Sequence, residues 1–411
     1  MKVLQVIPSL SAAHGGPSRA IRLIEQALLT QEIEVETATT DDDGPGRRIS
    51  TAEVDCGEHP EGHKGAAPTY SSLHPATVKP IRHYFPKRLE FYKVSPGFAR
   101  WIFRHVRDYD LVHIHALFSF TSVVSAWAAR RAGVPYVVRP LGTLNRYGVT
   151  QRRPWLKQLS LKLIEGPILR HAAAVHFTAE AERLEAETLG VPLRSAVVPL
   201  AVEAMPATDS TMFHARFPQL RGKRCVLTLS RLNKVKNLEG LLRAFALLHQ
   251  DWLDVRLVIA GDGEVDYVAR LKRLADELGV ADRVVWTGFV DGELKASAFA
   301  AAQVFVLPSF SENFGIAAAE ALMAGLPCVL GEGVALADDV AQAGAGVVTA
   351  PNPQAIAREL QELLGDDARL AEMGVQARLL ASENFSLEAM GASLHALYSR
   401  ILRQNSSGHI E

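Results

Sequence analysis

The stretch SFSENFGIAAAEALMAGLPCV, residues 309–329, decides the fold of this chain. The apolar run at residues 304–307 precedes it and predicts a buried parallel strand that ends at Pro308. A helix is then expected from about Gly315, through the alanines, to about Met323. The order strand, polar loop and helix is the repeating unit of an α/β protein.

The residues at the two ends of this helix support that interpretation. Ser311 or Asn313 is placed to cap the first turn. Gly325 and Pro327 stop the helix, and Cys328 begins a second buried strand. The stretch therefore predicts two neighbouring strands of a parallel sheet with one helix between them.

Two glutamates give this unit a chemical meaning. Free backbone N–H groups at a helix N-terminus attract anions, so a phosphate or diphosphate is the expected guest near Gly315. Glu312 lies just before those donors and can accept hydrogen bonds from hydroxyls that the phosphate carries. Glu320 lies inside an apolar helix, so it needs a partner or must face a cleft. The alternative for Glu320 is a helix glutamate that faces solvent.

Glu312 and Glu320, with Phe314, Gly315 and Ile316 between them, resemble the donor-sugar motif of the retaining glycosyltransferases of family 4. The resemblance implies the GT-B fold and a nucleotide-sugar donor. It also implies that Glu312 binds sugar hydroxyls and is catalytic, and that Glu320 binds the ribose. The helix start faces the diphosphate, so the donor-binding set includes Asn313, Phe314, Gly315 and Ile316.

A second motif carries two cations. Arg231 and Lys236 follow an apolar strand, five residues apart, and can grip both phosphates of a diphosphate. A pair of surface charges is the alternative. The pattern Ser-Arg-Leu-x3-Lys-Asn resembles the diphosphate clamp of family 4, which makes both residues donor-binding and catalytic. A later glycine turn at Gly263 is one that the family places near the nucleotide.

The first strand, at residues 3–7, leads to a glycine pair, Gly15 and Gly16, before a helix at residues 20–29. Such a pair lets a ligand approach the backbone closely at a helix N-terminus. The resemblance places this loop, with His14, near donor phosphate or acceptor, so the glycines are predicted to bind donor and His14 acceptor. A simple strand-to-helix turn is the alternative.

Two histidines alternate along the strand at residues 110–115. Period two places His113 and His115 on one face, with His115 at the carboxyl end, where open α/β sheets bind ligands. The resemblance puts a similar pair near the reacting groups. His115 is therefore predicted to assist catalysis, and His113 and Arg139 to bind the acceptor. Structural histidines in the core are the alternative.

The length is enough for two domains of about 200 residues, and the resemblance to family 4 implies that they are Rossmann-like domains of the GT-B class facing each other across a deep cleft. Residues 1–205 are the expected acceptor-binding domain and residues 206–385 the nucleotide-sugar-binding domain. Residues 386–411 are expected to form a helix that returns to the first domain. Residues 203–222 are polar and contain proline, which is typical of an interdomain linker.

Composition narrows the function class. With 411 residues, 48% hydrophobic and 22% charged, the chain has enough core for two soluble domains. A net charge of −1 argues against a dedicated nucleic-acid binder. The three cysteines, Cys56, Cys225 and Cys328, have no zinc spacing and suit a reducing compartment. No signal peptide and no run of eighteen apolar residues is present, so a cytoplasmic protein is expected.

The acidic run at residues 41–43 is the one candidate for a metal site. It lies in a turn rich in glycine and proline, where solvated acids are common. Because the cationic clamp and the helix N-terminus already neutralise a diphosphate, the expectation is that no metal and no cofactor is needed. The resemblance to family 4 implies, in addition, that the anomeric configuration is retained without a protein nucleophile.

Residues 79–107 contain eight Lys or Arg and one acid, interleaved with aromatics, and residues 152–162 repeat the mix. Such a surface favours an anionic membrane face or acceptor. The alternative is a helix at residues 90–107 that packs its aromatics inward. The expected partners are a GDP- or UDP-linked sugar and a saccharide or lipid-linked acceptor, in polysaccharide or glycolipid assembly at the inner membrane face. Competing hypotheses are another GT-B activity, such as a sugar-nucleotide epimerase, and an inactive nucleotide-sugar-binding protein.

Overall fold

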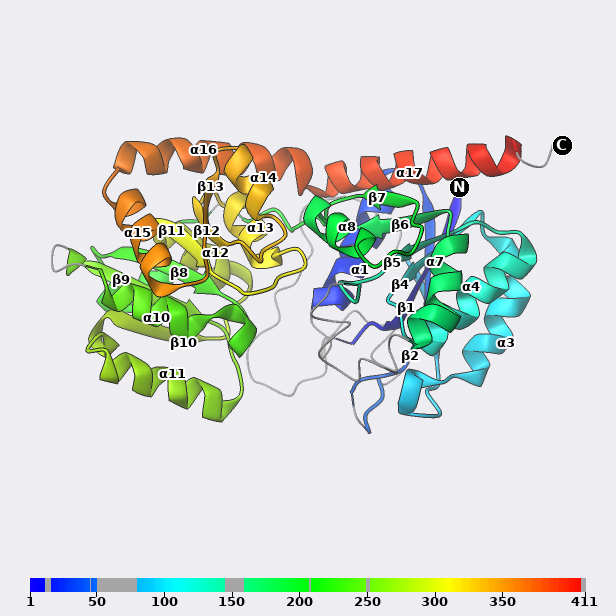
Figure 1. Ribbon diagram of the computed structural model, residues 1–411, viewed down its shortest axis with the longest axis horizontal. Coiled ribbons are helices and arrows are strands. Elements are labelled where there is room, and N and C mark those ends of the chain that lie inside the picture. The colour runs from blue at the N-terminus through cyan, green and yellow to red at the C-terminus, as the bar shows by residue number, and fades with distance from the viewer. Residues whose placement is uncertain are drawn as a thin grey trace. The chain divides into compact units, whose positions relative to one another are not determined.

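The computed structural model describes residues 1–11, 16–44, 46–49, 80–144, 159–206, 208–248 and 252–407. The chain forms two compact α/β units (Figure 1). Unit 1 combines Met1–Ala201 with Leu387–Glu411, and unit 2 is Val202–Ser386. Each unit is built around a parallel sheet, so the predicted pair of Rossmann-like domains with a C-terminal helix is confirmed.

Unit 1 has a seven-stranded sheet in the order β3-β2-β1-β4-β5-β6-β7. All neighbouring strands are parallel. The strands are β1 (Lys2–Ser9), β2 (Glu34–Thr40), β3 (Ile81–Phe85), β4 (Leu111–His115), β5 (Tyr136–Arg139), β6 (Ala174–Phe177) and β7 (Ser195–Val197).

The two faces of this sheet differ in chemistry because successive side chains alternate. Leu4, Val6, Val112 and Ile114 belong to an apolar core. Four helices also contribute to this core: α3 (Pro96–His105), α4 (Phe120–Ala132), α7 (Gly166–His171) and α8 (Glu180–Glu187).

The opposite face carries polar side chains, including Gln5 and both predicted histidines, because these residues alternate with the core set. The helices α1 (Gly16–Thr30) and α17 (Leu387–Ser407) pack against each other. A Cβ at Gly391 of α17 would lie 2.5 Å from the Ala27 carbonyl oxygen of α1, so glycine permits the close helix contact. A tyrosine of α17, Tyr398, reaches His113 on β4.

Unit 2 has a six-stranded parallel sheet in the order β10-β9-β8-β11-β12-β13. The strands are β8 (Arg224–Leu229), β9 (Val255–Ala260), β10 (Val284–Gly288), β11 (Val304–Leu307), β12 (Cys328–Gly331) and β13 (Gly346–Thr349). The helices are α9 (Thr211–Arg216), α10 (Leu238–Ala246), α11 (Val265–Glu277), α12 (Gly292–Ala301), α13 (Ile316–Met323), α14 (Ala337–Gln342), α15 (Pro353–Leu364) and α16 (Asp367–Asn384).

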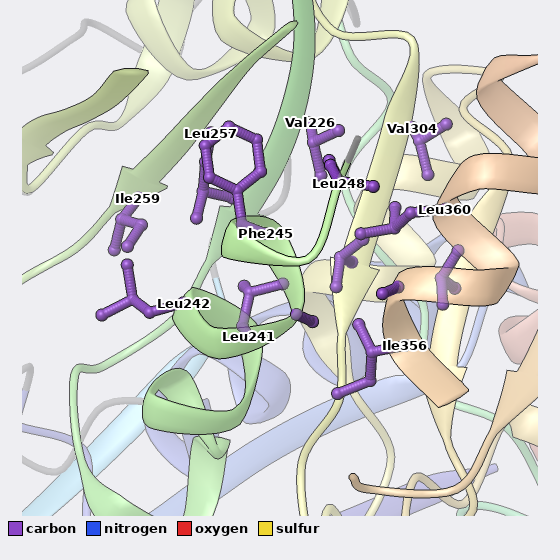
Figure 2. Close-up of a cluster of buried hydrophobic side chains, with 14 of the residues drawn as sticks. Val226, Leu241, Leu242, Phe245, Leu248, Leu257, Ile259, Val304, Ile356 and Leu360 are labelled. Atoms are coloured by element: carbon purple, nitrogen blue, oxygen red, sulfur yellow. The ribbon is translucent and has the colours of Figure 1, made fainter. Parts of the chain in front are cut away.

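The core of unit 2 lies where α10 and α15 cover the sheet. Figure 2 shows Leu241, Leu242 and Phe245 of α10 beside strand residues such as Leu257, with Leu360 of α15 nearby. The helix α10 is amphipathic, and its apolar side chains are fully buried. Burial of each such side chain stabilises the unit by roughly 1.5–3 kcal/mol before entropy is subtracted.

In each sheet the strand order reverses once. The reversal lies between β1 and β4 in unit 1 and between β8 and β11 in unit 2. Loops that leave the carboxyl ends of these strand pairs diverge, which leaves a crevice where open α/β sheets bind ligands. The two cations, the Glu312 loop and the glycine pair follow three of these strands, and His115 ends the fourth, so the topology explains why these motifs fall where they do.

Two expectations about elements were wrong. The helix expected at residues 90–107 begins only at Pro96, where Ser95 caps it, and residues 81–85 before it form the edge strand β3. Residues 203–222 are not a bare linker, because they contain α9, which packs on α12 with Phe213 fully buried. Among the described residues, no helix is long and apolar enough to cross a bilayer.

Candidate functional site

The loop after β8 presents the two predicted cations. It turns into a short 3-10 helix, Lys234–Lys236, whose first turn is capped by the side chain of Asn233 through the Val235 N–H at 3.1 Å. Asn237 follows in the left-handed conformation, φ 54°, and its amide donates to the Pro308 carbonyl oxygen at 3.2 Å. This turn fixes the backbone of Lys236, while Arg231 is exposed.

Glycines hold this loop against the loop after β9. A Cβ at Gly261 would lie 1.8 Å from the Ser230 carbonyl oxygen, and one at Gly263 would lie 2.2 Å from that of Leu232. The Leu232 N–H also donates to the Asp262 carbonyl oxygen at 2.8 Å. Gly263 therefore has an internal structural reason to be glycine, and its predicted contact with the donor stays a prediction.

The loop after β11 leads to α13 with the boundaries that the sequence predicts. Gly315 is the N-cap residue, at φ 90°, where a residue with a side chain would be strained. The prediction that Ser311 or Asn313 is the capping residue of α13 was wrong, since the N-cap position is held by Gly315, which has no side chain to make a cap hydrogen bond. A helix that begins at a glycine presents its first-turn N–H groups without a capping side chain at the N-cap, which is an arrangement that suits an anion.

The two loops meet, and they bring the predicted lysine and glutamate together. The Phe310 N–H donates to the Val235 carbonyl oxygen at 2.9 Å. The Lys236 ammonium donates to the Glu312 carboxylate, and these side chains are 15% and 22% exposed. An ion pair with this much exposure contributes little to stability but can exchange its partners with a ligand.

Glu320 has a partner, as its burial requires. Its carboxylate accepts a hydrogen bond from the Lys295 ammonium of α12 at 2.9 Å, and the two side chains are 3% and 8% exposed. The solvent-facing alternative is therefore wrong. Binding of a ribose by Glu320 stays a prediction, and Lys295 is a neighbour that sequence reasoning missed because it comes from a different helix.

The other residues of the Glu312–Glu320 motif differ in whether their side chains are buried or partly exposed. Phe314 is buried and packs edge-to-face on Phe385, with ring centroids 5.5 Å apart, so its side chain belongs to the core of unit 2. Asn313 and Ile316 are partly exposed beside Gly315.

In unit 1, His113 and His115 share a face of β4, as the alternation predicts, and both are fully buried. The Nε2 atom of His115 lies 2.6 Å from Gln5 Oε1. Burial lowers the pKa of both imidazoles well below the usual range, so both are neutral. Their burial favours the structural alternative, and contact of either with substrate stays a prediction.

Hydrogen bonds determine which ring nitrogen of His113 and of His176 carries the hydrogen. The two histidines lie in a chain of hydrogen bonds that runs from Tyr398 of α17 to the Val198 carbonyl oxygen. His176 Nε2 lies 2.8 Å from the Val198 carbonyl oxygen, which can only accept, so Nε2 carries the hydrogen. Burial lowers the pKa of His176 to about 3, so its Nδ1 is an acceptor and His113 Nε2 donates to it at 3.3 Å. His113 Nδ1 then accepts from the Tyr398 hydroxyl at 2.7 Å.

We call His113, His176 and Tyr398 the histidine chain. His176 lies in a strand that the sequence indicates, but nothing in the pattern links it to a tyrosine 222 positions later. Tyr398 could have been noticed only as an aromatic on the expected C-terminal helix.

Arg139 lies beside the histidine chain at the end of β5 and is 2% exposed. Its Nε and Nη1 atoms have no hydrogen-bond partner among the residues that the structure describes. Burial lowers the pKa of the guanidinium to about 10, although the nearby carboxylate of Glu182 opposes that shift. A buried cation with free donors suits an anionic or hydroxyl-rich guest, which leaves its predicted role open. Gly16 is exposed at the first position of α1, whereas His14 and Gly15 lie outside the described residues.

The interpretation of residues 41–43 as solvated acids was wrong. Asp42 is 1% exposed, and its carboxylate accepts from the ammonium groups of Lys87, at 2.6 Å, and Lys93. Asp41 accepts from the Lys87 N–H at 2.6 Å. These carboxylates serve as internal partners for two lysines of the basic segment, and no group of metal-ligating side chains occurs in the described ranges.

A buried carboxylate outside the predicted site belongs to Glu165. It ends a π-helical turn, Leu161–Glu165, and accepts from the Phe118 N–H at 3.1 Å and the Tyr92 hydroxyl at 3.3 Å. Within the described part of the chain, its Oε2 atom has no hydrogen-bond partner. Burial raises the pKa of Glu165 to about 7.

Comparisons with known proteins agree with this arrangement. Residues 15–201 match the Glycosyl transferase 4-like domain, and residues 211–380 match Glycosyl transferases group 1. The chain is 35% identical over 182 residues to the GDP-mannose-dependent alpha-(1-6)-phosphatidylinositol monomannoside mannosyltransferase of Mycolicibacterium smegmatis. That match covers 42% of this chain and less than half, 47%, of the mannosyltransferase. The 2-deoxystreptamine glucosyltransferase of Streptomyces kanamyceticus is 29% identical over 71% of this chain and 78% of its own length.

Solved structures share the fold along the whole chain. HepE of Anabaena, in complex with UDP, gives a TM-score of 0.76 at 19% identity and covers 97% of this chain and 100% of its own. The sucrose-phosphate synthase of Thermosynechococcus elongatus gives 0.74 at 19% identity, with 98% and 100% coverage. Together, the matched profiles and the two-sheet architecture make this chain a member of the group 1, family 4-like glycosyltransferases with the GT-B fold.

Proposed function

We propose that this enzyme moves a hexose from a nucleotide diphosphosugar to a saccharide or lipid-linked acceptor, with retention of the anomeric configuration. The observation that carries the proposal is the contact between Lys236 and Glu312 beside the N-terminus of α13. An incoming diphosphate would take over the Lys236 ammonium and leave the Glu312 carboxylate to accept from sugar hydroxyls. Arg231 would bind the same diphosphate from the preceding turn.

The chemistry needs no protein nucleophile in this proposal. The bond between the anomeric carbon and the diphosphate oxygen breaks, and the acceptor oxygen forms its bond to that carbon on the same face. The proton of the acceptor hydroxyl passes to the departing diphosphate oxygen. Arg231, Lys236 and the α13 N-terminus stabilise the negative charge that develops there, and one such donor typically contributes about 10²–10³ in turnover.

The relatives guide the choice of substrates. The mycobacterial relative is GDP-mannose-dependent by its name, and HepE binds UDP, so GDP- and UDP-linked sugars are the donors to test. A relative from Streptococcus pneumoniae is an alpha-monoglucosyldiacylglycerol synthase, which supports a lipid-linked acceptor. We infer a cytoplasmic enzyme of polysaccharide or glycolipid assembly, with unit 2 holding the donor and unit 1 the acceptor.

Titration with UDP, GDP and their hexose conjugates, followed by transfer assays, tests the proposal. Lys236→Met should lower kcat/KM at least 100-fold, because the leaving group loses a cation. Lys234→Met is the matched control, since Lys234 is exposed in the same turn. The clamp assignment fails if Lys236→Met stays within twofold of the parent enzyme, or if both variants lose activity equally.

Two further measurements test the mechanism. NMR of fresh product should show the donor's anomeric configuration, and inversion would reject the retaining mechanism. Because cationic side chains already neutralise the diphosphate, activity should survive EDTA. Loss of activity that magnesium or manganese restores would show that a divalent metal is required.

A further inference from the structure

An exposed face of α3 and α4 combines aromatic and cationic side chains. Phe103 of α3 and Trp127 of α4 are 39% and 61% exposed. Their rings contact each other edge-to-face with centroids 5.2 Å apart. Large apolar side chains on a surface carry information when they gather in this way rather than lie singly.

Five arginines surround this pair. Arg100 and Arg107 lie three residues before and four residues after Phe103, which puts them beside it on the helix surface. Arg104 follows Phe103 directly and lies four residues after Arg100 and three before Arg107, so the three arginines form one stripe along its flank. On α4, Arg130 and Arg131 stand three and four residues after Trp127. All five are exposed, and none has an ion-pair partner among the residues that the structure describes. We call these seven side chains the arginine–aromatic face.

The other sides of both helices are committed to the fold. Phe98, Ile102 and Val106 of the α3 segment, and Val124 and Ala128 of α4, belong to the core of unit 1. The two helices lie side by side (Figure 1). The arginine–aromatic face therefore points away from the sheet, and nothing in the fold of unit 1 requires its composition.

Acids do not offset this charge. Two acids occur between residues 96 and 133, and each has a partner. Asp108 lies 3.0 Å from His105 Nδ1, and Asp110 accepts from the Lys2 N–H at 2.7 Å. Five unpaired positive charges on one face are a local excess in a protein whose net charge is −1.

We propose that the arginine–aromatic face docks unit 1 on an anionic membrane surface. Arginine stems lie along apolar surface while their charged heads meet phosphates, and tryptophan and phenylalanine enter the interfacial layer. A membrane fits better than a protein partner because the apolar part is only two rings wide and the rest is one sign of charge. The face refines the broad basic segment predicted from the sequence, in which Arg82, Lys87 and Lys93 are ion-paired internally.

Docking would bring the enzyme to a lipid-linked acceptor, a consequence that rests on the proposed function. The docking itself needs neither donor nor acceptor. It can therefore fail while the transferase assignment stands, and the reverse is also possible.

Sedimentation with vesicles tests the proposal. The protein should bind vesicles of phosphatidylcholine with 30% phosphatidylglycerol and should dissociate from them as the salt concentration rises. Its binding to vesicles of pure phosphatidylcholine should be weak or absent. Near an anionic leaflet each arginine is worth about a fivefold gain in partitioning, so Arg104→Gln with Arg131→Gln should lower it by about 25-fold. Arg243→Gln with Arg273→Gln removes two exposed arginines from unit 2 and should change partitioning less than threefold.

Tryptophan fluorescence gives a second measurement, because electrostatic binding alone would not shift the emission of Trp127. Anionic vesicles should shift tryptophan emission to the blue, and Trp127→Phe should remove most of that shift while most of the binding remains. Equal binding to neutral vesicles, equal losses in both arginine pairs, or a shift that persists without Trp127 would overturn the proposal. So would an altered oligomeric state of the Arg104/Arg131 variant with unchanged vesicle binding, because that result would identify a protein interface instead.

Discussion

The histidine chain makes a sharp prediction about Tyr398. Its hydroxyl donates to His113 Nδ1 at 2.7 Å in a fully buried environment, and burial raises the pKa of this phenol, so it keeps its proton. Tyr398→Phe removes one oxygen and leaves His113 Nδ1 without a donor. A buried acceptor left unsatisfied costs about 1–3 kcal/mol, so we expect a loss of roughly 2 kcal/mol in the stability of unit 1.

Peptide-resolved hydrogen exchange is the suitable assay, because two units need not unfold together. Amides of β4 and β6 should exchange about 30-fold faster in Tyr398→Phe, as expected for about 2 kcal/mol, while amides of β8 and β11 keep their rates. Tyr267→Phe is the matched control, since its hydroxyl donates to Glu239 at 2.7 Å within unit 2. That variant should leave β4 unaffected.

A double-mutant cycle tests the proton direction itself. His113→Phe removes the acceptor, so adding Tyr398→Phe to it should cost about 1–2 kcal/mol less than in the parent. If the cycle gives no coupling, or if β4 keeps its exchange rates in Tyr398→Phe, the assigned chain of donors is wrong.

Three other perturbations follow from described contacts. The folded pKa of Glu165, about 7, lies above its unfolded value of 4.5, so its contribution to stability is complete below pH 4.5 and lost as pH rises through 7. The free energy of unfolding of Glu165→Gln, measured relative to the parent by urea titration, should therefore rise by up to about 3 kcal/mol from pH 5 to pH 9. The same difference between variant and parent at both pH values would contradict this. Lys295→Met removes the lysine partner of buried Glu320 and should cost on the order of 3 kcal/mol in unit 2, more than Lys295→Met with Glu320→Gln; the reverse order would reject the pair as structural. Gly263→Ala places a Cβ 2.2 Å from a backbone oxygen and should lower the melting temperature by several degrees, whereas Gly97→Ala, whose Cβ meets nothing closer than 3.9 Å, should change it by less than two.

The sequence predicted those parts of the site that short-range patterns encode. The boundaries of α13, the turn at Gly315 and the two cations after β8 follow from spacing and strand alternation within about twenty residues. The contact between Lys236 and Glu312 was not predicted, although both residues were predicted to bind the donor. It forms because their loops leave the carboxyl ends of neighbouring parallel strands, β8 and β11, which lie at one edge of the sheet.

Other features depend on contacts that no local pattern specifies. Asp42 lies in a sequence typical of a solvated turn. It is buried and ion-paired because Lys87 and Lys93, more than forty residues later in the chain, pack against it. The aromatics of residues 84–103 mostly pack inward: Phe98 is buried, and Trp101 stacks among His83, Phe85 and His105. Composition alone cannot separate these residues from Phe103, because burial depends on which side of α3 meets the sheet.

The placement of α17 also orders events during synthesis. The strands of unit 1 are made first, but the hydroxyl that donates to His113 belongs to α17, which follows the whole of unit 2 in the chain. Until α17 emerges, α1 contacts the polar side of the sheet, where its Glu25 accepts from Thr37 of β2, but the tyrosine that reaches His113 is missing while about 185 residues of unit 2 are translated. Premature termination within this long interval would release a unit 1 without α17, an incompletely packed species that chaperones and proteases recognise readily.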